Sequence, residues 1–197
     1  MTDFTIKGTI YLGVLEDYSK RVPGGLDAVF AKMANAETIA FLKQRFLPSS
    51  WYDIFPLMAL NQGAERASGI ARAVLIRESA RSLAKRDMNG VYRALLRLAT
   101  PALVASRLPK VFGLYMNFGM NFGGATTVAL ERGILLQLKR VPGVLVAWLE
   151  LSVESFVMSL LGAAGGRDIT MVMRATDRHE GNKGDSLVDV EFEARWK

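Results

Sequence analysis

The stretch Leu187–Trp196 reads LVDVEFEARW and alternates hydrophobic with polar residues. Successive side chains of a strand point to opposite faces of a sheet, so we expect Val190 and Phe192 on a buried face and Asp189 on the solvent face. Residues 168–175 (DITMVMRA) alternate in the same way. With the polar loop TDRHEGNKGD between them, the two stretches predict a C-terminal β-hairpin.

Two more strands are expected upstream of this hairpin. Residues 126–130 and 134–138 are rich in β-branched and aliphatic side chains, and they flank the turn Glu131-Arg132-Gly133. An apolar helix is expected over residues 143–161. The order strand, strand, helix, strand, strand predicts a four-stranded antiparallel sheet covered by helices, so we assign the chain to the α+β class.

The first half of the chain is predicted to be mostly helical, because hydrophobic residues recur near a helical period and good helix formers dominate. Asn35 and Ala36 mark a break between two short helices. Residues 5–15 mix β-branched and aromatic side chains and predict a strand or an irregular arm. The expected helical segments cover residues 27–47, 55–86, 89–99 and 101–115.

Length and composition indicate one folded unit. The chain has 197 residues, half of them hydrophobic, so we expect a single domain over residues 1–197, helical at about 20–115 and sheet-containing at about 120–197. It has no Cys, which excludes disulfides, thiolate catalysis and iron–sulfur clusters. Its net charge of +6 favours an acidic partner protein or anionic lipid; nucleic acid is less favoured, because aromatic residues are sparse beside the basic ones.

The N-terminal segment does not have the pattern of a signal peptide, since it contains acidic residues and lacks an apolar core preceded by positive charge. The longest apolar run, residues 141–166, contains Glu150 and Glu154. A membrane-spanning helix would have to shield both carboxylates from lipid, so we interpret the run as a core helix. No transmembrane segment and a cytoplasmic location are therefore expected.

A glycine-rich stretch, residues 113–124 (GLYMNFGMNFGG), precedes the first predicted strand of the sheet. It lacks the Gly-Lys-Ser/Thr sequence of a phosphate-binding loop. Its glycines favour a bend from helix into sheet. A second possibility is that its aromatic side chains line the mouth of an apolar pocket. The candidate ligand-binding residues are Tyr115, Phe118, Phe122 and, from the apolar helix, Trp148.

The sole histidine, His179, lies in the predicted hairpin loop beside Asp177, Glu180 and Asp185. The spacing of these residues matches no calcium-binding loop, and one imidazole cannot form a zinc site alone. We therefore expect no metal site and no cofactor.

Glu150 and Glu154 lie one helical turn apart, and paired carboxylates in a dry site can perform acid/base chemistry. The favoured interpretation is a solvent-facing stripe, or ion pairs with arginines on a neighbouring helix. No catalytic residue is assigned, so the protein is not predicted to be an enzyme.

Two surfaces are candidates for binding a partner protein. Arg77 and Arg81 lie on one face of a predicted helix and would suit an acidic partner, although such a face is more often merely solvated. Trp51 and Tyr52, in PSSWYDIFP, are large amphipathic aromatics of the kind that gather at interfaces or fill turns between helices.

As a set, five stretches resemble a family of paralogous proteins of unknown function described mainly from myxobacteria. They are IKGTIY, LPSSWYDIFPL, NGVYRALLRLATPAL, RLPKVFGLY and GDSLVDVEFEARW, and they cover nearly the whole chain. The order of elements is also similar to a ligand-binding fold shared by haem-based nitric-oxide sensors, TRAPP subunits and four-vinyl-reductase-like domains. That likeness implies a binding module, often a homodimer, rather than an enzyme.

The chain departs from these relatives at reactive positions. Leu187 follows Gly184, Asp185 and Ser186 where related sensor domains have a cysteine, and no histidine is expected on a core helix to hold haem. The leading hypothesis is a non-enzymatic module that binds a small hydrophobic molecule or lipid between helices and sheet. The alternative is an adaptor that acts through the basic helix face or the aromatic patch.

Overall fold

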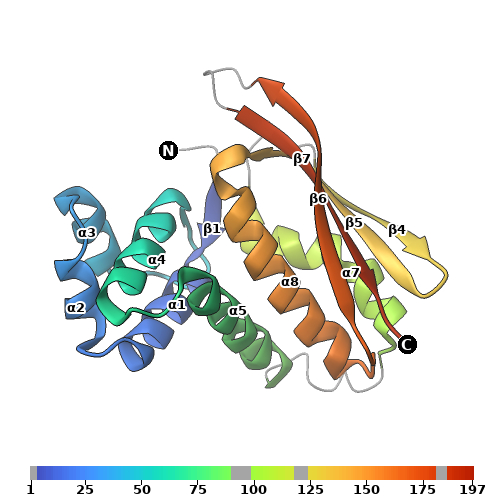
Figure 1. Ribbon diagram of the computed structural model, residues 1–197, viewed down its shortest axis with the longest axis horizontal. Coiled ribbons are helices and arrows are strands. Elements are labelled where there is room, and N and C mark those ends of the chain that lie inside the picture. The colour runs from blue at the N-terminus through green and yellow to red at the C-terminus, as the bar shows by residue number, and fades with distance from the viewer. Residues whose placement is uncertain (1–3, 90–98, 118–123, 181–185) are drawn as a thin grey trace.

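Five helices form the N-terminal half of the computed structural model, which describes residues 4–89, 99–117, 124–180 and 186–197 (Figure 1). The predicted break at Asn35 is confirmed, because its side chain caps the third helix by accepting a hydrogen bond from the Thr38 N–H at 2.8 Å. The predicted helix 55–86 is divided at Gly69, whose φ of 72° ends the fourth helix. The five are α1 Gly8–Arg21, α2 Gly25–Ala31, α3 Ala36–Lys43, α4 Phe55–Ser68 and α5 Arg72–Asn89.

The expectation of a strand or irregular arm over residues 5–15 is wrong for most of that segment. Only β1 (Thr5–Lys7) is extended, and α1 begins at Gly8. The aromatic residue of this segment packs in the core from the helix: Tyr11 is fully buried and stacks on Phe46, with ring centroids 4.5 Å apart. β1 lies between β2 (Trp51–Asp53) and β3 (Met116–Asn117) in a small antiparallel sheet.

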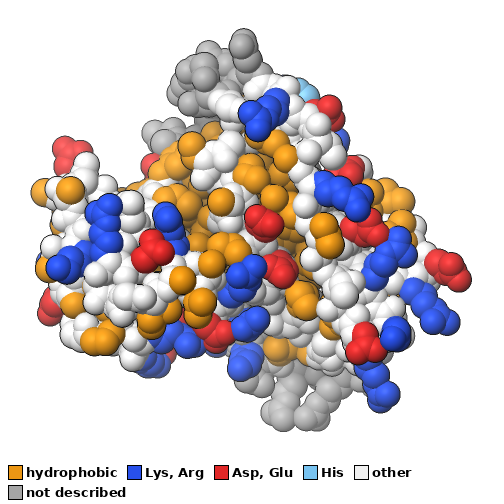
Figure 2. Space-filling view, viewed as in Figure 1, with side chains coloured by type: hydrophobic (Ala, Val, Ile, Leu, Met, Phe, Trp, Pro, Cys, Tyr) orange, Lys and Arg blue, Asp and Glu red, His pale blue; other side chains and the backbone are white. Residues whose placement is uncertain are grey.

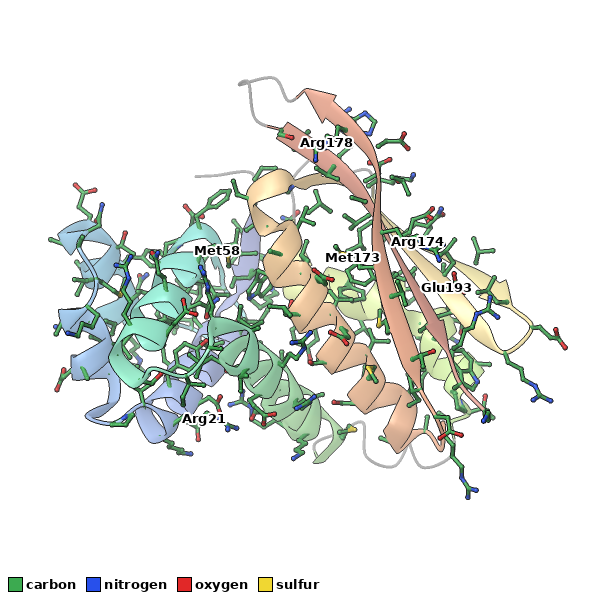
Figure 3. All side chains as sticks on the ribbon, viewed as in Figure 1. Arg21, Met58, Met173, Arg174, Arg178 and Glu193 are labelled. Atoms are coloured by element: carbon green, nitrogen blue, oxygen red, sulfur yellow. The ribbon has the colours of Figure 1, made fainter. Side chains whose placement is uncertain are left out.

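The predicted four-stranded antiparallel sheet is confirmed, in the order β4-β5-β7-β6. The inward side chains of its two central strands are closed to solvent; Leu136 of β5 and Val190 of β7 are fully buried. Figure 3 shows the alternation in β6, where Met173 lies between the strand and the helix beside it, and Arg174 lies on the other side near Glu193. The strands are β4 Ala125–Leu130, β5 Gly133–Pro142, β6 Thr170–Glu180 and β7 Ser186–Arg195.

Two helices from the C-terminal half pack on the inner face of this sheet. α7 (Pro101–Tyr115) contacts β4 and β5, and α8 (Val146–Ala163) contacts β6, β7 and, most extensively, α5. α8 therefore lies between the helical half and the sheet (Figure 1). α7 begins as predicted, with the Thr100 hydroxyl accepting a hydrogen bond from the Leu103 N–H. The helix expected over residues 89–99 falls almost wholly outside the described residues.

Asp189 does not lie on a solvent face as expected, since only 5% of its surface is exposed. Both strands beside β7 have a register shift at this level, between Leu138 and Val141 in β5 and between Ala175 and Arg178 in β6. An extra residue in each neighbour bends its strand over the carboxylate. β6 also continues to Glu180, so half of the predicted loop is strand.

Within the described residues, the segment 143–163 that ends in α8 is long and apolar enough to cross a membrane by length and composition. Half of its most apolar window is buried inside the protein. Leu149, Val157 and Leu161 are fully buried, as the interpretation of a core helix requires.

Candidate ligand-binding site

A cavity of ≈ 70 Å³ lies where the helical half meets α7 and α8. α1, α4 and α5 form one wall, and α7, α8 and the β3 residue Met116 form the other. Figure 2 shows hydrophobic side chains gathered along the centre of the molecule's face, in the region where α8 lies in Figure 1. The lining is predominantly apolar, which is typical of a small-molecule site.

The helical periodicity of α1 and α5 places their apolar residues on the cavity wall. Ile10, Val14 and Tyr18 are spaced four residues apart, so they share one face of α1. α5 packs against α1 in the opposite direction, with Ser79 donating a hydrogen bond to the Asp17 carboxylate at 2.8 Å. The small side chain of Ala80 on the α5 face leaves the space that the neighbouring helices do not fill.

The floor of the cavity has a buried polar pair. The Tyr18 hydroxyl donates a hydrogen bond to Oδ1 of Asn61 on α4 at 2.6 Å, and both residues are at least 98% buried. Burial raises the pKa of the Tyr18 phenol far above its ordinary value; Ser79 opposes this by hydrogen bonding, and the nearby Asp17 charge adds to it. Tyr18 is therefore a neutral donor at any physiological pH.

The rim of the cavity is charged. Arg86 borders the cavity, and its Nη1 lies 3.1 Å from Oε2 of Glu16. The guanidinium rests on Gly13, because a Cβ at that position would lie only 2.0 Å from Nη2 of Arg86. Lys20 binds the same Glu16 carboxylate and, as the largest influence, lowers the pKa of that group. This rim is solvated, unlike the floor.

Glu154 is bound by an arginine from α5, as the favoured interpretation of the two carboxylates proposed. Its Oε2 lies 3.1 Å from Nη2 of Arg77, whereas Glu150 is exposed one turn earlier. The pair joins α5 to α8 beside the cavity. A carboxylate committed to a guanidinium is a poor general base, so the arrangement favours a structural role over acid/base chemistry.

Of the four predicted ligand-binding residues, Tyr115 and Trp148 line this cavity. Tyr115 packs edge-on against Phe156, with ring centroids 5.9 Å apart. Phe118 and Phe122 lie outside the described residues. None of the described residues of the four-stranded sheet borders this cavity, because α7 and α8 separate it from the strands. A ligand position between helices and sheet stays a prediction.

Several lining residues were missed by sequence reasoning. Ile10, Val14 and Tyr18 fall in or next to the segment expected to be a strand or arm, although their four-residue spacing was a helical signal. Asn61 had no such signal, because a single amide in an apolar helix is visible as a site only when its surroundings are known.

The predicted partner-binding residues all have contacts within the protein. Lys7 places its ammonium 4.0 Å from the centroid of Trp51, and Tyr52 packs in an aromatic cluster with its hydroxyl bound by the Leu47 N–H at 2.8 Å. Arg77 pairs with Glu154, and Arg81 pairs with Glu78 in its own helix. Binding of a partner at these positions stays a prediction.

His179 lies near the end of β6 rather than in a loop, and 39% of its side chain is exposed. Its Nε2 is 3.2 Å from Oδ1 of Asp189, the buried carboxylate between the two bulges. In the part of the chain that the structure describes, His, Asp and Glu side chains form no group of three that would hold a metal ion.

No protein-family model and no curated protein matches this sequence. Among solved structures, an A71G mutant of an H-NOX protein from K. algicida aligns with a TM-score of 0.61 at 12% identity, over 97% of this chain and 96% of that one. An H-NOX protein from S. oneidensis aligns with a TM-score of 0.57 at 10% identity, over 97% and 96%. An oxygen-binding H-NOX domain related to soluble guanylate cyclases gives 0.53 at 12%, over 96% and 92%.

These likenesses extend over nearly the whole of each chain, and their identities are too low to carry residue roles. They confirm at the level of fold the expected similarity to haem-based nitric-oxide sensors. The chain has the H-NOX fold, an α+β arrangement of N-terminal helices and a four-stranded antiparallel sheet.

Proposed function

We propose that this protein is a non-enzymatic module that binds a small apolar molecule in the cavity between α1, α4, α5 and α7, α8, and that occupancy of the cavity is its regulatory signal. The observation that carries the proposal is the apolar cavity itself, at the junction of the two halves and bordered by Tyr115 and Trp148. The fold supports it, since similar structures are haem-nitric oxide/oxygen binding domains.

Haem itself does not fit the residues of this cavity. Haem iron in proteins is held by His, Cys, Met or Tyr. The chain has no Cys, and its one histidine, His179, is bound to Asp189 and does not border the cavity. Burial keeps the Tyr18 phenol protonated. Tyr115 and Met116 also border the cavity, but a cofactor site normally encloses about 300 Å³ or more, against ≈ 70 Å³ here. We infer a smaller ligand.

Three hydroxyl groups around the cavity are engaged in ways that suit binding rather than catalysis. Tyr18 donates to Asn61, Ser79 donates to Asp17, and Ser152 donates to the Trp148 carbonyl oxygen at 2.8 Å. A nucleophilic hydroxyl needs a neighbouring general base to accept its proton. None of the described residues gives these hydroxyls a histidine partner.

α8 is the element through which an occupant of the cavity would act. Trp148, Val153 and Phe156 border the cavity, while other residues of the same helix pack on α5 and on the sheet. A ligand that fits one packing of α8 better than another shifts the population toward that packing. The consequence is a change in the α8 surface that a partner protein can detect.

The test is ligand-dependent stability of the purified protein, together with native mass spectrometry and extraction of any bound molecule. A panel of small cyclic hydrocarbons and ketones should raise Tm. At a ligand concentration of about 100 times Kd the gain is about 2.7 kcal/mol, or about 5–10 °C for a chain of this length. The absence of both a bound mass and a rise in Tm across the panel contradicts the proposal.

A matched pair of variants locates the binding. Ala80→Ile places a larger side chain in the cavity and should abolish the ligand-dependent rise in Tm. Ala102→Ile makes the same replacement at an exposed position of α7 and should preserve it. An equal loss of binding in both variants, or in neither, places the ligand elsewhere.

A further inference from the structure

Asn61 has an amide nitrogen that the fold leaves without a partner. The residue is 2% exposed, and its Nδ2 is buried with no hydrogen-bond partner among the described residues. A buried donor left unpaired destabilises the folded state, so most such groups in proteins are satisfied. Because Asn61 borders the cavity, the occupant of the cavity is placed to supply the missing acceptor.

The orientation of the amide is set by Tyr18. The distance of 2.6 Å between the Tyr18 hydroxyl and the Asn61 side chain suits an O–H···O bond and is short for N–H···O. Oδ1 of Asn61 therefore faces Tyr18, and Nδ2 is left for a different partner. Ser79 donates its own hydrogen to the carboxylate of Asp17.

Other buried hydroxyls near the cavity have already donated their hydrogens, those of Tyr18 and Ser79 within this network and that of Ser152 to its own helix. The Arg86 guanidinium differs from these buried groups, because it is half-exposed at the rim and paired with Glu16. Within this floor, the Asn61 amide is thus the donor left without a partner among the described residues.

A negative charge is disfavoured on this floor. Asp17 lies on the far side of Ser79. Burial of the site and the Asp17 charge both raise the pKa of Tyr18, because they destabilise a negative charge there. A carboxylate ligand would be destabilised in the same way when it approached Asn61. The complementary acceptor is uncharged.

We propose that Asn61 makes the cavity selective for an uncharged, compact apolar molecule that carries one carbonyl-type acceptor oxygen, bound by Nδ2 of Asn61. This inference rests on the proposed function and specifies the class of ligand. The volume of ≈ 70 Å³ limits the ligand to a small body. An apolar cavity of about 150 Å³ is known to take benzene, so a cavity of about half that volume suits a probe with about four non-hydrogen atoms.

Acetone and 2-methylpropene form the test pair, because they share one shape and differ in a C=O or C=CH2 group. Their Kd values are measured for the wild-type protein and for Tyr18→Phe/Asn61→Leu, which replaces both members of the polar pair so that neither is left unpaired. Loss of the hydrogen bond should raise the ratio of the ketone Kd to the alkene Kd by about tenfold.

Ser159→Ala is the control, since it removes a hydroxyl of α8 that is bound to its own helix and does not border the cavity, and it should leave the ratio unchanged. A second readout is the side-chain amide resonance of Asn61, which should shift with the ketone and not with the alkene. An unchanged ratio in the double variant, with both probes bound, overturns the role of Asn61 and leaves the proposed function standing. If neither probe binds the wild-type protein, the proposed function fails as well.

Discussion

Arg77 of α5 donates two hydrogen bonds to one carboxylate oxygen of Glu154 on α8, from Nη2 at 3.1 Å and from Nε at 3.3 Å. The two residues are 77 positions apart in the chain and connect the helical half to the helix that covers the sheet. The pair joins the two walls of the cavity, one of which contains α5 and the other α8. It is thus one of the contacts that a rearrangement of α8 would have to change.

Replacing Glu154 with Gln should weaken the contact between α5 and α8 only modestly. About a third of each side chain is exposed, 36% for Arg77 and 29% for Glu154, so solvent screens the pair. We expect the free energy of unfolding to fall by about 0.5–1 kcal/mol, and the difference to shrink in high salt. Chemical denaturation at two salt concentrations measures both effects. Glu150→Gln, at the exposed position one turn earlier, should have no effect; an equal loss there contradicts a specific pair.

The pairing of Tyr18 with Asn61 predicts non-additive effects on stability. Tyr18→Phe leaves Oδ1 of Asn61 buried without its donor, which should lower the free energy of unfolding by about 1–3 kcal/mol. Tyr18→Phe/Asn61→Leu should be closer to wild type than Tyr18→Phe alone, because both polar groups are removed together. Urea denaturation of the four members of the cycle gives the coupling. Additive losses would mean that the two side chains do not depend on each other.

Asp189 should make the protein sensitive to acid. Burial alone raises the pKa of its carboxyl, but the Arg140 N–H, Lys139 and His179 stabilise the charged form by more, so the pKa falls below its ordinary 3.8. A folded pKa below the unfolded one stabilises the protein fully above about pH 5, and this stabilisation is lost as the pH falls through the folded pKa. Asp189→Asn should lower stability at pH 7 by about 1–3 kcal/mol.

The same Asp189→Asn variant should also lose less stability than wild type between neutral pH and acid. Thermal unfolding across that range measures the slope. Glu131→Gln removes a carboxylate that is exposed in the turn between β4 and β5, and this variant should keep the wild-type slope. If Asp189→Asn kept that slope as well, the Asp189 carboxylate would not be the source of the acid sensitivity.

Replacing each of two glycines with Ala should change the free energy of unfolding in opposite directions. At Gly133, where β5 begins, a Cβ would lie 2.5 Å from the Ala194 carbonyl oxygen of the neighbouring strand. The clash is with backbone, so we expect a loss of about 1–3 kcal/mol. Gly113 lies inside α7 with no described atom within 4 Å of such a Cβ. Gly113→Ala should therefore gain about 0.5–1 kcal/mol from helix propensity.

Calorimetry on the two Ala variants separates these effects, since 1 kcal/mol shifts Tm by about 2–4 °C in a chain of this length. A gain in Tm for Gly133→Ala would mean that β5 and β7 are not as close as the structure places them. A loss for Gly113→Ala would indicate a neighbour of α7 outside the described residues.

Much of the fold was predictable where one physical rule acted on a local pattern. The alternation around Phe192 gave the sheet, because a strand exposes its two faces in turn. The Asn35 cap and the start of α7 after Thr100 follow from the hydrogen-bonding needs of helix ends. Residues 8–15 were misjudged because β-branched and aromatic residues favour strands on average, whereas burial of Tyr11 against Phe46 favours the helix here.

By itself the sequence determined the class of fold, the strands of the larger sheet, the core helix α8 and the exclusion of thiol chemistry. Only the tertiary structure decided that Tyr18 meets Asn61 across 43 positions, that α1 and α5 leave a cavity beside Trp148, and that Asp189 is buried. The physical reason is that periodicity reports which face of an element is apolar, whereas a cavity or a buried polar pair depends on how separate elements pack together.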